Sequence, residues 1–145
     1  MNDASSHAVG AIAASASHGV RERFTVGDLS RVRMLVREAG VAAGIPAAKV
    51  AALVVAVNEI AGNAIRYGGG FATITLRGLL GLLLVEISDD GPGLPPDLVI
   101  VRPAADAVGG RGLWLAYRLC ERVDMLSSAA GLTVRLHASL AGTGR

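Results

Sequence analysis

The chain has 145 residues, which is long enough for one domain with a substantial core. Apolar residues make up 52% of it and aromatic residues only 3%, so the core is expected to be aliphatic. The net charge of +2 comes without a run of lysine or arginine, which argues against nucleic acid as a direct partner. Cys120 is the only cysteine, so a disulfide framework is excluded and a cytoplasmic location is expected.

The first 20 residues are expected to form a flexible tail. Residues 4–18 are rich in Ala, Ser and Gly, and Ala14-Ser15-Ala16 imitates a signal-peptide cleavage site. No lysine or arginine precedes this segment and it has no leucine-rich stretch, so we expect no signal peptide. The apolar run 78–85 is too short to span a bilayer, and no membrane association is expected.

Two helices are predicted in the first half of the chain, after an edge strand at 21–26. Asp28 is a candidate N-cap for a helix over 29–43. Pro46 then occupies a first-turn position of a second helix that runs to about Tyr67. Apolar residues at spacings of three and four predict the buried stripe of this second helix: Val50, Leu53, Val54, Val57, Ala61 and Ala64.

Hairpins and one short helix are predicted in the second half. Strands are expected at 71–77 and 82–88, a helix at 112–122, and two further strands at 123–128 and 132–138. We therefore expect an α+β domain over 21–140, with an antiparallel or mixed sheet, helices on one face and a short C-terminal tail at 141–145.

Glu59, Asn63 and Arg66 lie on one face of the second helix, opposite its apolar stripe. A carboxylate, an amide oxygen and a guanidinium could supply a base, a ligand for Mg²⁺ and a phosphate contact. A solvated polar helix face would show the same pattern.

Two glycine-containing motifs follow. Asp89 begins D-D-G-P-G after a buried strand, where its carboxylate could accept a hydrogen bond from an amino group while Gly91 and Gly93 allow close backbone approach. Gly110, Arg111 and Gly112 lie directly before a predicted helix, where free amides and the helix dipole favour an anion. An ordinary Pro/Gly turn and a flexible loop are the alternatives.

Other common sites are excluded or poorly supported. No P-loop sequence occurs, and Leu115 stands where a Rossmann motif needs its third glycine. Three scattered histidines and one cysteine make no zinc set. Trp114 and Cys120 are expected to be buried helix residues rather than ligand-binding or catalytic groups.

Together, N-E-I-A-G-N (58–63), D-D-G-P-G (89–93) and G-G-R-G-L (109–113) resemble the motifs of the GHKL ATPase family. The resemblance covers about residues 22–138 and implies the Bergerat ATP-binding fold, a two-layer sandwich with a mixed, mainly antiparallel sheet. Within that family, the chain is similar to bacterial anti-sigma factor serine/threonine kinases of the actinobacterial type.

The resemblance also implies roles for individual residues. Asn63 would bind Mg²⁺, Glu59 would be the general base, and Asp89 would hold the adenine amine of ATP. Other residues would contact or shape the nucleotide site: Arg66, Gly91, Gly93, Gly110, Arg111, Gly112 and Thr133. The 16 residues 94–109 would form the ATP lid.

The implied function is phosphorylation of an anti-anti-sigma partner of the STAS type, which would control the availability of a sigma factor. Related kinases often form homodimers, so the resemblance also implies homodimerisation. Two alternatives remain at this point: a non-catalytic ATP-binding interaction module, and the ATP domain of a histidine kinase.

Overall fold

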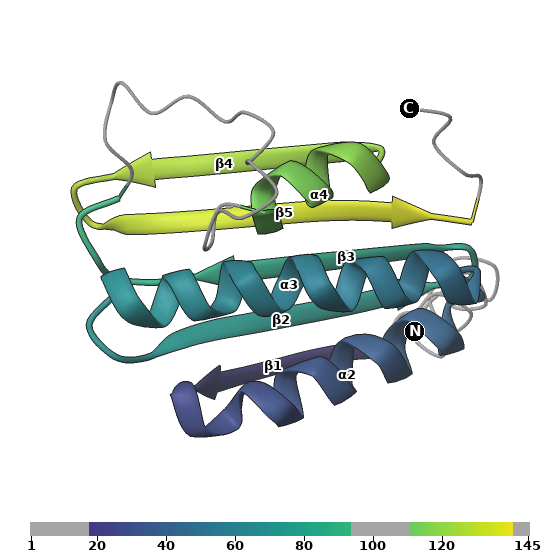
Figure 1. Ribbon diagram of the computed structural model, residues 1–145, viewed down its shortest axis with the longest axis horizontal. Coiled ribbons are helices and arrows are strands. Elements are labelled where there is room, and N and C mark those ends of the chain that lie inside the picture. Colours follow the sequence, from purple (N-terminus) through teal and green to yellow (C-terminus); the bar gives the residue numbers. More distant parts are fainter. Residues whose placement is uncertain (1–17, 94–110, 141–145) are drawn as a thin grey trace, which may run out of the picture.

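The computed structural model describes residues 18–93 and 111–140, which form two layers (Figure 1). One layer is a five-stranded sheet in the order β1-β2-β3-β5-β4, and every pair of neighbouring strands is antiparallel. The other layer contains α2, α3 and α4, all on one face of the sheet. The α+β prediction with helices on one face is therefore confirmed, and the sheet is antiparallel rather than mixed.

The elements follow the predicted order with small changes at their ends. They are β1 (His18–Phe24), the 3₁₀ turn η1 (Val26–Asp28), α2 (Leu29–Ala42), α3 (Ala47–Tyr67), β2 (Ala72–Leu79), β3 (Leu82–Ser88), α4 (Arg111–Leu119), β4 (Arg122–Ser128) and β5 (Gly131–Ser139).

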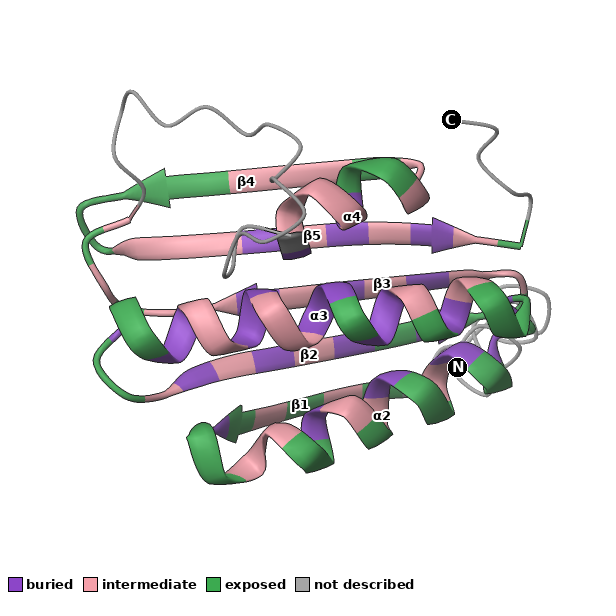
Figure 2. Ribbon diagram, in the orientation of Figure 1, coloured by how far each residue is buried: buried purple, intermediate pink, exposed green. Residues whose placement is uncertain are grey.

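The central helix α3 lies between α2 and α4 and supplies much of the core (Figure 2). All six residues of its predicted stripe are buried, together with Ala56, Ile60 and Ile65. Buried aliphatic residues at alternate positions of β2 and β3 pack beneath it, as period-two burial requires. By length and composition α3 resembles a membrane span, but its apolar side chains fill the core of this domain.

Asp28 is the N-cap residue of α2, as predicted, but its side chain makes no capping hydrogen bond to that helix. Its carboxylate accepts a hydrogen bond from the Thr25 amide (2.9 Å) and so closes η1. One local prediction needs correction. The last helix ends at Leu119 rather than Arg122, because the Glu121 amide donates to the carbonyl of His137 (2.9 Å) and draws the chain into the sheet. Cys120 is buried as predicted but lies just beyond the helix, and Trp114 is only half-buried.

Candidate functional site

Glu59 and Asn63 lie one turn apart on the side of α3 that faces α4. Both are half-buried, and within residues 18–93 and 111–140 neither side chain has a hydrogen bond or ion pair. Their neighbour Asn58 points the other way, where its Oδ1 accepts a hydrogen bond from Nη1 of Arg33 on α2 (2.9 Å). This contact ties α3 to α2 and leaves the polar groups of Glu59 and Asn63 available to a ligand.

The first turn of α4 packs directly on α3 at Glu59. A Cβ atom added to Gly112 would lie 2.5 Å from Cβ of Glu59 and 2.9 Å from the carbonyl oxygen of Ala56. Only glycine permits this approach. The amides of the first helical turn have no partner within the helix, so α4 brings anion-binding groups beside the carboxylate and amide of α3.

Asp89 follows β3 and packs against the C-terminal end of α3. Its Oδ1 accepts hydrogen bonds from the amides of Gly91 (2.8 Å) and Leu132 (3.4 Å), which fixes the side chain. Oδ2 has no hydrogen-bond partner in the described part of the chain. One carboxylate oxygen is thus held by the backbone while the other can accept a hydrogen bond from a ligand.

Glycines allow the segment around Asp89 to pack so closely. A Cβ on Gly68 would lie 2.4 Å from Cβ of Asp89, and one on Gly91 would lie 2.2 Å from the carbonyl oxygen of Tyr67. Gly93 has φ of 81° and approaches Ser128. These contacts place the D-D-G-P-G segment across the end of α3, beside the β4–β5 turn.

Residues of the three motifs therefore lie one after another in space along α3. Gly112 contacts α3 at Glu59, Asn63 is one turn further on, and Asp89 contacts Gly68 just past the helix. Nine residues separate Glu59 from Gly68, which is about 13 Å at the helical rise. An elongated ligand with an anionic end near α4 and an amine near Asp89 would fit this arrangement.

Two residues predicted to contact the nucleotide, Thr133 and Arg66, do not lie in this row of groups along α3. Thr133 bonds Ser88 (Oγ1 to Oγ, 3.0 Å) on the helix-free face of the sheet, because the alternate residues Val134 and Leu136 fill the core. It lines a hollow of about 570 Å³ with Asp89 and Asp90, away from Glu59 and Asn63. Arg66 is exposed, with its guanidinium 5.8 Å from the ring of Tyr67.

The predicted lid at 94–109, Gly110 and the side chain of Arg111 lie outside the described residues. The backbone of Arg111 begins α4, as the motif requires.

Sequence reasoning missed Gly68 and Gly131. Their sequence context indicates only a helix end at Gly68 and a hairpin turn at Gly131. A Cβ on Gly131 would lie 2.0 Å from the carbonyl oxygen of Asp89, and its φ is 143°. Both glycines thus determine where Asp89 lies, and nothing in the local sequence distinguishes them from common turn residues.

The donor set fits a magnesium ion that shares its ligands with a nucleotide. No group of three or more His, Cys, Asp or Glu residues that could hold a metal occurs within the described ranges. Mg²⁺ in nucleotide sites takes only one or two protein oxygens and completes its shell with phosphate and water. The unpaired Asn63 amide beside Glu59 satisfies that smaller requirement.

The chain matches the profile of the histidine kinase-like ATPase domain over residues 23–138. No curated protein shows significant similarity to it.

Solved structures that share the fold include the following two. The RsbU and RsbW domains of Rv1364c from Mycobacterium tuberculosis are 18% identical with a TM-score of 0.55; the match covers 83% of this chain and 32% of that one. The histidine kinase domain of a blue-light activated histidine kinase from Erythrobacter litoralis EL346 is 20% identical with a TM-score of 0.53; the match covers 89% and 70%. The chain thus spans about a third of the first structure.

Proposed function

The chain belongs to the family of histidine kinase-like ATPase domains, which implies ATP binding, and we propose that it is an anti-sigma factor kinase. In this proposal it binds ATP with Mg²⁺ and phosphorylates a serine or threonine of a STAS-type anti-anti-sigma protein. It also binds a sigma factor, whose release depends on the phosphorylation state of that partner.

The observation that carries the proposal is the linear order of Gly112, Glu59, Asn63 and Asp89 along α3. The first turn of α4 would receive the phosphates, Asn63 would hold Mg²⁺, and Oδ2 of Asp89 would accept a hydrogen bond from the adenine amine. These roles match the chemistry of each group and the order of the parts of ATP.

Glu59 is the group best placed to act as the general base. Its carboxylate is half-buried, unpaired within the described residues, and beside the turn that would hold the phosphates. It would accept the proton of the partner's hydroxyl as that oxygen bonds to the γ-phosphorus. ADP then leaves with the electron pair of the broken phosphorus–oxygen bond, and the protein acts by positioning and charge neutralisation.

A histidine kinase ATP domain is the main alternative, and the likeness to the Erythrobacter structure favours it. Such a kinase needs a phosphoacceptor histidine on a dimerising helix. Of the described residues, His18 and His137 are the histidines, and both lie in strands.

The test is incubation of the protein with γ-labelled ATP, Mg²⁺ and a STAS-type protein from the same organism. We expect label on a serine or threonine of that protein, and loss of the label with Glu59→Ala. If the label persists in Glu59→Ala, Glu59 is not the general base. ATP binding without any transfer would favour the non-catalytic module.

A further inference from the structure

The face of the sheet opposite the helices carries an uneven distribution of charge. Strand residues alternate between the two faces, and the buried set packs under α2, α3 and α4. The other set faces away from the helices, and in the described part of the chain no helix covers it. Its charged members are Arg21, Arg23, Arg77, Glu86, Arg122, Asp124 and Arg135.

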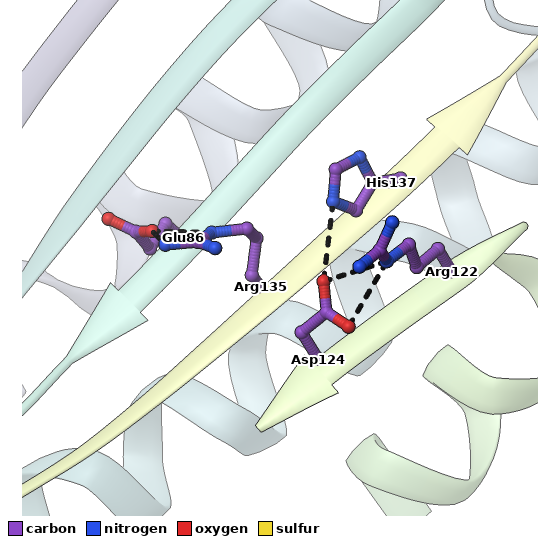
Figure 3. A network of polar contacts seen from close by, with 5 residues as sticks. All are labelled: Glu86, Arg122, Asp124, Arg135 and His137. Atoms are coloured by element: carbon purple, nitrogen blue, oxygen red, sulfur yellow. Dashed lines mark hydrogen bonds and ion pairs between the residues drawn. The ribbon is translucent and has the colours of Figure 1, made fainter. Parts of the chain in front are cut away.

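On β3, β5 and β4 these charges are paired with one another (Figure 3). Arg135 contacts Glu86 (2.6 Å) across β5 and β3. Arg122 contacts Asp124 (3.0 Å) on β4. The charges of these four side chains therefore cancel on this half of the face.

On β1 and β2 the arginines have no such partners. Arg21, Arg23 and Arg77 are all exposed, and the residues opposite them in the register are Thr75, Thr73 and Gly19. No acidic group in residues 18–93 or 111–140 pairs with any of the three. We call these three arginines the basic strip.

Glu22, the acidic residue of β1, does not neutralise the positive charge of the basic strip. Glu22 points to the helix side, where it forms a bidentate pair with Arg31 of α2. Arg23 is instead placed over the ring of Phe71, with 3.9 Å from its guanidinium carbon to the ring centroid. The cation is held in position by an aromatic ring and keeps its charge available.

The three arginines are close enough to repel one another. Arg21 and Arg23 are two residues apart on β1, and Arg77 is the diagonal neighbour of Arg21, so adjacent members are separated by about 7 Å. Among the described residues, five arginines and two carboxylates give the face a charge of +3, and the other described side chains together carry −1. The positive charge of the described residues is therefore concentrated on this face.

We propose that the basic strip is a docking surface for a protein partner that presents an acidic surface. Carboxylates placed against Arg21, Arg23 and Arg77 would relieve the repulsion and form charge-assisted hydrogen bonds. Thr73 and Thr75 lie opposite Arg23 and Arg21, and Phe71 lies under Arg23, so the surface offers a mixed polar and apolar contact. Nucleic acid is disfavoured because the basic track is short and Glu86 and Asp124 lie on the same face.

This surface lies on the opposite side of the sheet from Glu59 and Asn63. The inference therefore does not depend on the proposed kinase activity, and the two surfaces can be occupied at the same time.

The test measures binding of a short glutamate-rich peptide by NMR titration of the full chain. The test variant carries Arg21→Gln, Arg23→Gln and Arg77→Gln. We expect shifts centred on β1 and β2, and affinity about tenfold weaker in the triple variant at fixed salt. Its melting temperature should be unchanged or higher, since like-charge repulsion is removed.

A matched variant removes the same charge from the helix side, with Arg37→Gln, Arg66→Gln and Arg118→Gln. It should bind the peptide within about twofold of the original chain. An equal loss of peptide affinity in both variants would show that binding depends only on net charge, and it would overturn the proposal. Shifts confined to the helices would overturn it too, and so would a DNA duplex that binds β1 and β2 more tightly than the peptide.

A charge exchange provides a second test that does not depend on loss of function. The variant that carries Arg21→Glu, Arg23→Glu and Arg77→Glu should bind a lysine-rich peptide that the original chain does not bind. Failure of this exchange in a variant that melts cooperatively would contradict the docking surface.

Discussion

Gly112 and Glu59 are in direct contact, with the backbone of α4 so close to α3 that a Cβ on Gly112 would lie 2.5 Å from Cβ of Glu59. This contact joins two motifs that are more than fifty residues apart in the sequence. It brings the start of one helix, with its free amides, to the polar edge of another. The geometry of the candidate site therefore depends on the absence of one methyl group.

Replacement of Gly112 with alanine is expected to impair both folding and nucleotide binding. The added methyl group would collide with Glu59 and with the carbonyl oxygen of Ala56, so α4 must move away. Such overpacking costs about 1–3 kcal/mol of unfolding free energy. Chemical denaturation and an ATP titration of Gly112→Ala would measure the two effects.

Gly62 provides the matched control, since it is also a helical glycine and lies in α3 beside Asn63. A Cβ there would meet no atom within 4 Å. Gly62→Ala should raise the unfolding free energy by about 0.5–1 kcal/mol through helix propensity. If both alanine variants lost the same stability, the close packing at Gly112 would not be the cause.

Asp89→Asn should lower ATP affinity with little change in stability. An asparagine oxygen can still accept the hydrogen bonds from Gly91 and Leu132, so the melting temperature should change little. The charged acceptor for the adenine amine is lost, and ATP affinity should fall by about tenfold or more. Calorimetry beside a melting curve tests this; unchanged ATP affinity would place adenine elsewhere.

Gly131→Ala should disturb Asp89 from the opposite side. Its Cβ would lie 2.0 Å from the carbonyl oxygen of Asp89. Gly81 occupies the turn of the other hairpin, also at positive φ, but its Cβ would meet nothing closer than 3.7 Å. We expect Gly131→Ala to lose ATP binding, and Gly81→Ala to lose only stability. Equal ATP affinity in the two folded variants would argue against this role for Gly131.

The stability of the domain should decrease at acid pH through Glu121. Partial burial raises the pKa of this carboxyl, but hydrogen bonds from Lys49 (3.1 Å) and the Ser139 amide (2.7 Å) outweigh it and hold the pKa below its usual value of 4.5. These contacts join α3 to β5 and to the segment between α4 and β4. Because the folded pKa is the lower one, their stabilisation is complete above pH 4.5 and is lost as the pH falls through the folded value.

Glu121→Gln provides the comparison, since it removes the titrating group and keeps a hydrogen-bond acceptor. Melting temperatures measured from neutral pH to below pH 4 should fall less steeply for this variant. Parallel curves for the two proteins would assign the acid sensitivity to other carboxyls.

Most of the fold was predictable because its signals are local and periodic. The stripe of α3 from Val50 to Ala64 and the alternation in β2 and β3 specify which faces are buried. The end of α4 was not predictable, since it depends on a hydrogen bond between Glu121 and His137 across the sheet.

The site was predictable in part for the same reason. Glu59 and Asn63 share a helix face, so their proximity follows from the helical period. The positions of Gly68 and Gly131 against Asp89 depend on long-range packing, and their sequence context shows only turns. The face on which Thr133 lies depends on the register of β5 with β3, which a single residue of slip would reverse.

The most direct measurement of the central claim is a calorimetric titration of ATP, with and without Mg²⁺, into the original chain and Asn63→Ala. The account predicts that Mg²⁺ strengthens ATP binding to the original chain. In Asn63→Ala this enhancement should disappear, while binding without Mg²⁺ stays the same. No ATP binding by the original chain, or the same Mg²⁺ enhancement in both proteins, would contradict the nucleotide site along α3.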